Sequence, residues 1–471
     1  MQGSILFPVF TSDAPLYEQL YRHLSAAIRR GELAPGEKLP SKRQMCAALN
    51  VSMSTVESAY SMLAAEGYVI ARPRSGYTVA RLHLIDPAPL SHGEMEGREE
   101  EESSLWEYSF STGAVDTSAF PFSTWARISK ESVYENPDLL QRGHPQGDLT
   151  LRRALAEFLG EYRGVRCHPD QILVGAGADY LLSILLQLLP DHGEVALEDP
   201  GYPAAYATVL HHGRRAVPIP VDGEGMDPEA LERSGAALAY VTPSHQFPLG
   251  VTMPVGRRSR LLRWAAEGEE RYLIEDDYDS EFRYTSRPIP AMQGLDRQGR
   301  VVYLGTLSRS IAPSIRVAYM ILPPTLVERY RREFPHSAST VSRFEQESLR
   351  RFLAQGFYAR HLRRTGNLYR EKCQLLTDAL SAIPGSVVSG HHGGLHFLLT
   401  VPGRSEEELV AAAAARSVRV QPLSRYCHSV SPAPSTLVLG YAGLGEKELA
   451  EAARRLVEAF SETGTATTPT A

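Results

Sequence analysis

The stretches YLIEDDYDSEF, residues 272–282, and VVYLGTLSRSIAPSIR, residues 301–316, decide the fold. Each opens on a short apolar run of the kind that forms a buried strand and continues into polar residues. Similar runs occur at 172–174 and 238–242, and helical stretches separate them. This alternation predicts an α/β body with a mostly parallel sheet between helix layers. Ligands of such sheets bind at the carboxyl ends of the strands, where these polar residues fall.

Another predicted strand end is rich in glycine. The run at 172–174 continues into GAGA at 175–178 and then into a helix predicted from Asp179 to Leu189. Free amide N–H groups at the start of this helix could cradle a phosphate. Tyr180 stands where a dinucleotide fingerprint needs its third glycine, which argues against a Rossmann cofactor site.

The first 80 residues predict a different module, with three helices followed by two strands around a turn at 73–76. A capping box is predicted over 54–57, at the start of the third helix. Helix-turn-helix plus a hairpin with a basic tip is a winged module, whose third helix can enter the DNA major groove. The predicted apolar positions are Leu16, Leu20, Leu24 and Ile28 in the first helix, Met45 and Leu49 in the second, and Val56, Tyr60 and Leu63 in the third.

Charge and length define the organisation of the 471 residues, of which 43% are hydrophobic. Residues 1–80 hold eight Lys/Arg against six acids, whereas 81–107 hold two against eight. The second stretch also contains prolines, glycines and serines, a composition typical of a flexible linker. We therefore predict a DNA-binding domain at 1–80, an acidic linker at 81–107, a body at 108–463 and a disordered tail at 464–471. The four cysteines form no Cys-x-x-Cys pair, and neither a signal peptide nor a membrane span is predicted.

The head resembles the GntR-type winged helix-turn-helix domain over roughly 13–80, through PLY at 15–17, GEKLPSKR at 36–43 and AEGY at 65–68. Such domains commonly carry arginine where this chain has Met53. Methionine cannot make bidentate contacts to guanine or phosphate, so site preference is expected to differ; Met53 could pack on a thymine methyl or face water. The expected DNA-binding residues are Lys42, Arg43, Ser52, Ser54, Thr55, Arg72, Arg74, Ser75, Gly76 and Tyr77.

The two deciding stretches, with EDPGYP at 198–203 and TPSHQFP at 242–248, resemble the body of class I aminotransferases of fold type I. Head, linker and body in this order resemble the MocR/GabR group of regulators, in which an aminotransferase-like domain senses an effector for a GntR head. The resemblance implies a pyridoxal phosphate pocket. Its expected cofactor- or effector-binding residues are Gly177, Ala178, Tyr202, His245, Asp276, Tyr278, Thr306, Ser308, Arg309 and Arg316.

The resemblance assigns roles to these residues. Asp276 would face the pyridine nitrogen, Tyr278 would bond the ring hydroxyl and Tyr202 would stack on the ring. The phosphate would be held by Arg316, Thr306, Ser308 and the amides around Gly177 and Ala178.

Arg309 departs from the family pattern, which places there the lysine that forms the internal aldimine. Schiff-base formation needs a neutral amine, and a guanidinium is protonated and delocalised. The sequence has five lysines, Lys38, Lys42, Lys130, Lys372 and Lys447, and none lies in a motif that would reach the site. Catalysis is therefore expected to be lost. A second departure is Val438, at the position expected for the arginine that clamps a substrate carboxylate; Arg425 could substitute for it.

The sequence thus predicts a DNA-binding transcriptional regulator whose catalytically inactive body senses a small molecule. The pocket could hold pyridoxal phosphate without a covalent link, a preformed adduct of cofactor and amino acid, or another small anion such as a carboxylate. The alternatives are an aminotransferase-like enzyme with an accessory DNA-binding head, and a scaffold with a vestigial pocket. The expected partners are a double-stranded DNA operator, the anionic effector and a second copy in a homodimer, in the cytoplasm and without a membrane. No metal site is expected. The adjacent histidines at 211–212 and 391–392 could suggest one, but no group of carboxylates or cysteines accompanies them.

Overall fold

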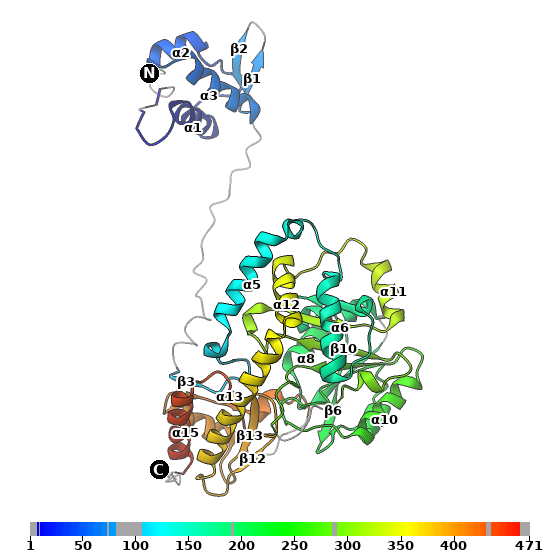
Figure 1. Cartoon of the computed structure of the whole chain (residues 1–471). Helices are drawn as coiled ribbons and strands as arrows, with labels where there is room; N and C mark the ends of the chain where they lie inside the picture. Colours follow the sequence, from blue (N-terminus) through cyan, green and yellow to red (C-terminus); the bar gives the residue numbers. More distant parts are fainter. Residues whose placement is uncertain are drawn as a thin grey trace, which may run out of the picture. The chain divides into compact units, whose positions relative to one another are not determined.

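The computed structural model describes residues 7–8, 10–72, 75–81, 106–189, 193–284, 290–429 and 435–461. The chain divides into two compact units, Met1–Gly97 and Arg98–Ala471, each with its own core (Figure 1). Most of the predicted linker and the whole predicted tail lie outside the described residues. Within the described ranges, no helix has the length and apolar character needed to cross a membrane.

The first unit is a three-helix module with a hairpin. Helices α1, α2 and α3 span Leu16–Arg29, Lys42–Leu49 and Met53–Ala65. Strands β1, Val69–Arg72, and β2, Gly76–Val79, pair antiparallel. The predicted apolar positions of this head form its core, except that Leu16 is 40% exposed and Leu49 is half-buried.

The capping box predicted over 54–57 is wrong. The N-cap of α3 is Ser52, whose hydroxyl accepts from the Thr55 amide at 3.2 Å. The head's capping box lies instead at the start of α2, between Ser41 and Gln44. Helix α3 begins two residues earlier than the pattern indicated because Ser52 already satisfies a free amide of its first turn.

The second unit contains an eight-stranded sheet in the order β4-β11-β10-β9-β8-β5-β6-β7. Neighbours among β10, β9, β8, β5 and β6 pair parallel, and β11 and β7 run antiparallel to the strands beside them. The predicted mostly parallel sheet is therefore confirmed. The strands are β4 Ile172–Gly175, β5 Val195–Asp199, β6 Ala216–Asp222, β7 Gly225–Met226, β8 Leu238–Val241, β9 Tyr272–Asp277, β10 Val301–Thr306 and β11 Ala318–Ile321.

Helices cover both faces of this sheet because its strands are apolar on both sides. Residues of α7, α8 and α11 pack in one buried cluster with one face, and residues of α6, α10, α12 and α13 pack with the other. These helices are α6 Leu149–Arg163, α7 Ala178–Leu188, α8 Pro203–His211, α10 Val255–Ala266, α11 Pro324–Glu333, α12 Arg343–Ala354 and α13 Phe357–Leu380; α5 Phe122–Glu135 and α9 Pro228–Arg233 complete this part.

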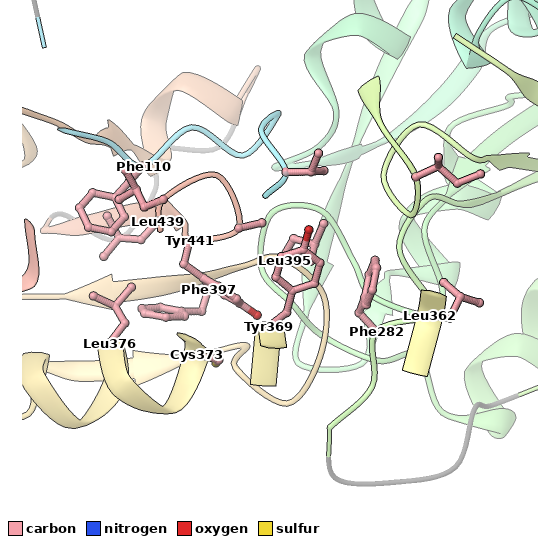
Figure 2. Close-up of a cluster of buried hydrophobic side chains, with 14 of the residues drawn as sticks. Phe110, Phe282, Leu362, Tyr369, Cys373, Leu376, Leu395, Phe397, Leu439 and Tyr441 are labelled. Atoms are coloured by element: carbon pink, nitrogen blue, oxygen red, sulfur yellow. The ribbon is translucent and has the colours of Figure 1, made fainter. Parts of the chain in front are cut away.

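A smaller sheet, ordered β12-β13-β16-β15, follows α13 in the chain. Figure 2 shows how side chains of α13, β13 and β16, including Leu376, Phe397 and Leu439, meet Phe110 in one buried cluster. The elements here are β12 Val387–Ser389, β13 His396–Thr400, β15 Gln421–Pro422 and β16 Thr436–Gly440, with α14 Glu406–Ala414, α15 Glu446–Ser461 and the pair β3 Tyr108–Ser109 and β14 Val418–Arg419.

Because the two units have separate cores, we expect a core cavity in one to destabilise that unit alone. Leu24→Ala, in the fully buried core of the head, should lower the free energy of unfolding of the head by about 2–5 kcal/mol. Hydrogen exchange of the α1–α3 amides would measure the loss. The matched variant is Leu376→Ala in the body core, and an equal loss of head protection in that variant would contradict independent folding.

Candidate functional site

A cavity of about 220 Å³ lies where the central strands reach their carboxyl ends. It brings together residues that follow β4, β5, β8, β9 and β10, as the sequence predicted for the polar strand ends. Nine of the ten expected effector-binding residues line it, all but His245. The full lining is Gly113, Gly177, Ala178, Asp179, Tyr202, Thr242, Phe247, Asp276, Tyr278, Thr306, Ser308, Arg309, Pro313 and Arg316.

One part of the cavity has the chemistry of an anion site. Gly177, with φ +106°, leads into the first turn of α7, which no side chain caps. A Cβ on Gly177 would lie 2.5 Å from Nη2 of Arg316, so the guanidinium rests against the bare glycine. Ser308 Oγ is buried and has no hydrogen-bond partner in the described part of the chain. A phosphate fits here, because free amides, a hydroxyl and a guanidinium converge on one place.

Asp276 brings a buried carboxylate to the cavity. Burial raises the pKa of Asp276 to about 7, while Tyr240, whose hydroxyl donates to Oδ2, opposes that rise. Nearby acids, Asp277 foremost, raise the pKa of Asp276 further. A protonated ring nitrogen placed against it would supply the missing counter-charge, so the residue fits a pyridine ring.

Aromatic rings form a wall of the cavity. The Phe247 ring packs edge-on against Tyr202, at 5.9 Å between centroids, and against Tyr278, at 6.0 Å. Burial raises the pKa of Tyr202 to about 12, so its hydroxyl stays protonated at neutral pH. Three rings of this kind suit a flat aromatic ligand.

His245 does not reach the cavity lining, contrary to the role that the sequence suggested for it. The imidazole is buried behind Tyr278, with Nδ1 3.0 Å from the Tyr278 hydroxyl and 3.0 Å from Oδ2 of Asp279. Burial alone would lower the pKa of His245, but Asp279 raises it above its ordinary value. The histidine thus positions Tyr278 from a second layer.

Arg309 occupies the cavity with a guanidinium rather than an amine. Its Nη1 donates to the backbone oxygen of Thr112. None of the described lining residues is a lysine. The buried lysine of the body, Lys372, lies away from the cavity lining, with Nζ 2.6 Å from Asp116 Oδ2 and 3.2 Å from the Ala442 oxygen.

The region beside β16 is apolar. Val438 is fully buried and packs in a cluster with Phe247, Leu398, Leu423 and Tyr426. Arg425, which the sequence offered as a substitute clamp, is exposed and does not line the cavity. Among the described residues, neither Val438 nor Arg425 offers a ligand carboxylate a guanidinium in the cavity.

In the head, the expected DNA-binding residues gather at the N-termini of α2 and α3 and in the hairpin, apart from Arg74, which lies outside the described residues. Arg43, Ser52, Ser54, Arg72, Ser75 and Gly76 are exposed, and Thr55 and Tyr77 are half-buried. The Ser52 hydroxyl lies 2.8 Å from the hydroxyls of Ser54 and Thr55. Lys42 forms an ion pair with Glu57 of α3 at 2.5 Å, which the sequence did not anticipate.

Comparison with known proteins assigns both units. Residues 16–79 match the family model "Bacterial regulatory proteins, gntR family", and 108–456 match "Aminotransferase class I and II". The chain is 40% identical over 460 residues to the uncharacterized HTH-type transcriptional regulator YdeL of Bacillus subtilis, covering 96% of this chain and 98% of that protein. The chain belongs to the family that joins a GntR helix-turn-helix domain to an aminotransferase domain.

Other members of this fusion family share nearly the whole chain. The probable rhizopine catabolism regulatory protein MocR of Rhizobium meliloti is 35% identical, covering 95% of this chain and 94% of that one. The pyridoxine biosynthesis regulator PdxR of Corynebacterium glutamicum is 33% identical, covering 92% and 93%. Among solved structures, kynurenine aminotransferase of Pyrococcus horikoshii superposes with a TM-score of 0.68 at 25% identity, covering 78% of this chain and 95% of that one. These matches confirm the predicted fold class.

Five residues that line the cavity were not predicted from the sequence. Thr242 and Phe247 lie inside the quoted motif at 242–248 and Pro313 inside the quoted stretch 301–316, and Asp179 follows the glycine-rich run at 175–178, so their position along the chain could have indicated them. Gly113 gave no such signal, because it precedes the first strand of the large sheet and reaches the cavity only in the folded protein.

A group of potential metal ligands also escaped the sequence analysis. His245, Asp279 and His396 are buried and place one ligand atom each within 4.8 Å of one another. His396 Nε2 already lies 3.1 Å from the Pro248 oxygen. A Cβ on Gly394 would lie 2.1 Å from His245 Cε1, so this group is tightly packed. The adjacent histidines at 211–212 and 391–392 are not in this group.

Gly177→Ala should disrupt the anion site. The new Cβ would collide with Arg316, and a positive φ is strained for alanine, so we expect the affinity for pyridoxal phosphate to fall at least about tenfold. Isothermal titration would measure it. Gly213→Ala is the control, since Gly213 has φ +68° but nothing within 4 Å of its added Cβ. Equal losses of affinity in both variants would show that backbone strain, and not the contact between Gly177 and Arg316, causes the loss.

Asp276→Asn should change the pH dependence of stability. Because burial raises the pKa of Asp276 to about 7, the folded protein keeps a proton that the unfolded chain releases from about pH 4 upward. The contribution of Asp276 to the free energy of unfolding is therefore fully present below pH 4 and is lost as the pH rises from 4 to 7. The variant should therefore be more stable than the unliganded parent at pH 8, by up to about 4 kcal/mol, and equal near pH 4. Urea unfolding of the body at both pH values measures this, and a pH-independent difference would contradict it.

Proposed function

We propose that this chain is a DNA-binding transcriptional regulator whose body binds a small anionic effector and does not catalyse transamination. The proposal is supported by relatives that this chain matches over more than nine-tenths of their length: PdxR and YdeL are named as HTH-type transcriptional regulators, and MocR as a probable regulatory protein. We further propose that the boundaries predicted from the sequence separate a head at 1–80 from a body at 108–463.

The observation that carries the loss of catalysis is Arg309 in the cavity. Aminotransferase chemistry needs an amine with a free lone pair, first to link the cofactor and then to move a proton. A guanidinium offers no such lone pair, and its Nη1 is already engaged by Thr112. Arg309 instead supplies a fixed positive charge that attracts an anion.

Pyridoxal phosphate, held without a covalent link, is the effector that the lining supports best. Arg316, Ser308 and the first turn of α7 would bind the phosphate, Asp276 would pair with the ring nitrogen, and Tyr202 would pack on the ring. When bound, the cofactor supplies an electron-poor ring. Proteins of related fold bind such groups. The Pyrococcus kynurenine aminotransferase was solved in complex with PMP, and LysN of Thermus thermophilus, 27% identical with a TM-score of 0.66, was solved with a phosphopyridoxyl-leucine.

An amino acid joined to the cofactor is less well supported than the cofactor alone. The apolar cluster around Val438 provides no partner for a carboxylate, and Arg425 is exposed. Another small anion remains the alternative occupant, because Arg309 and Arg316 bind either a phosphate or a carboxylate.

We propose that the regulator acts as a homodimer in the cytoplasm. The resemblance to fold type I bodies supports pairing of the bodies, and two heads on linkers over 81–107 would then read two half-sites of an operator. Effector binding would shift operator affinity, and operator binding would shift effector affinity by the same factor.

Arg309→Lys tests the missing amine. The parent protein with one equivalent of pyridoxal phosphate should show the spectrum of the unlinked aldehyde at the cavity, and peptide mapping after borohydride should find no cofactor on a cavity residue, as distinct from labelling of the five lysines elsewhere in the chain. The variant should gain a shifted absorption band and a borohydride-fixed adduct, because its amine can condense with the aldehyde. Arg309→Met, which has neither charge nor amine, is the control and should bind more weakly without an adduct. Borohydride-fixed cofactor on a cavity residue of the parent, or amino-group transfer by the parent that Asp276→Asn abolishes, would contradict the proposal and favour an enzyme.

A further inference from the structure

We infer that Glu57 of α3 selects cytosine at one position of each operator half-site. This rests on the proposed DNA-binding function and extends it to base preference. The recognition helix of a helix-turn-helix module contacts base edges in the major groove with residues near its N-terminus, and Glu57 lies in the second turn of α3.

The exposed face of α3 fixes which side chains a groove would meet. Met53, Glu57 and Ser61 recur every fourth residue and are exposed, with Ser54 and Ser58 beside them. The opposite face is buried in the head core: it carries Val56, Ala59, Tyr60 and Leu63. Because residues four apart lie on one side of a helix, the exposed five form a single stripe.

Glu57 is the charged residue of this stripe, and α3 carries neither lysine nor arginine. Its side chain is 57% exposed. A carboxylate can only accept hydrogen bonds, and cytosine presents a lone N4 donor in the major groove. Guanine presents two acceptors, thymine presents O4, and adenine places N7 beside its donor, so each of them opposes a carboxylate.

Lys42 holds this carboxylate in place. Its Nζ lies 2.5 Å from Oε1 of Glu57 and 5.8 Å from the centre of the Tyr77 ring, so the ion pair joins α2 to α3 beside the hairpin. Oε2 of Glu57 has no hydrogen-bond partner among the residues that the structure describes. One oxygen is therefore oriented and the other is available to a base. The lysine also offsets the repulsion between Glu57 and the DNA phosphates.

Met53 complements this readout one turn earlier on the same stripe. It is 44% exposed, and its Sδ lies 3.9 Å from Cys46 Sγ of α2. An apolar side chain facing the groove contacts the methyl group of thymine. The stripe thus lacks the bidentate guanine contact that an arginine would give.

The test is selection from a pool of random DNA duplexes with the full-length protein. The parent should enrich a motif that has cytosine at one position. The Glu57→Arg variant should enrich a motif that has guanine at the same position, because an arginine fork matches the two guanine acceptors. On duplexes that differ only at this base pair, the parent should prefer cytosine at least about fivefold, and Glu57→Ala should bring the ratio near one.

Glu18→Arg is the matched control, since it makes the same change in charge on α1, where Glu18 pairs with Arg22. It should alter overall affinity and leave the motif unchanged. If both Glu57 variants enrich the parent motif, Glu57 serves only as the partner of Lys42 and the inference is overturned while DNA binding stands. If no protein enriches any motif, the proposed DNA-binding function itself fails.

Discussion

Two consecutive carboxylates at the end of β9 organise the body. Alternation along a strand sends Asp276 to one face of the sheet and Asp277 to the other. Asp277 is fully enclosed, and burial would raise its pKa, but Arg163 at 2.8 Å and the Tyr303 hydroxyl keep the pKa of Asp277 below its ordinary value. This charge stays buried only because it is paired. With Asp277 fixed, Asp276 is held at the cavity, where burial raises its pKa to about 7.

The cavity combines an anion site, an aromatic wall and a buried acid. The anion cradle of Gly177 and Arg316, the aromatic wall and Asp276 complement a phosphorylated pyridine. Arg309, which also lines the cavity, offers a positive charge that can attract an anion but cannot form a Schiff base.

The two units use charge in different ways. The body buries its ionic groups in pairs such as Arg163–Asp277 and Lys372–Asp116, where loss of one partner would strand the other. The head keeps the Lys42–Glu57 pair partly exposed, with side chains 29% and 57% exposed, where it contributes little stability.

The sequence by itself determined the α/β class and the helix-turn-helix module, because apolar runs, their periodicity and the polar residues at strand ends are local signals. It also fixed the absence of an amine at position 309. Nine of the fourteen cavity-lining residues were named from the resemblance of its motifs to class I aminotransferases. Only the tertiary structure decided that His245 lies behind Tyr278, that Gly113 and Thr112 approach the cavity, that Val438 joins an apolar cluster and that Glu57 pairs with Lys42. These contacts join residues distant in the chain, and local periodicity carries no information about which distant groups pack together.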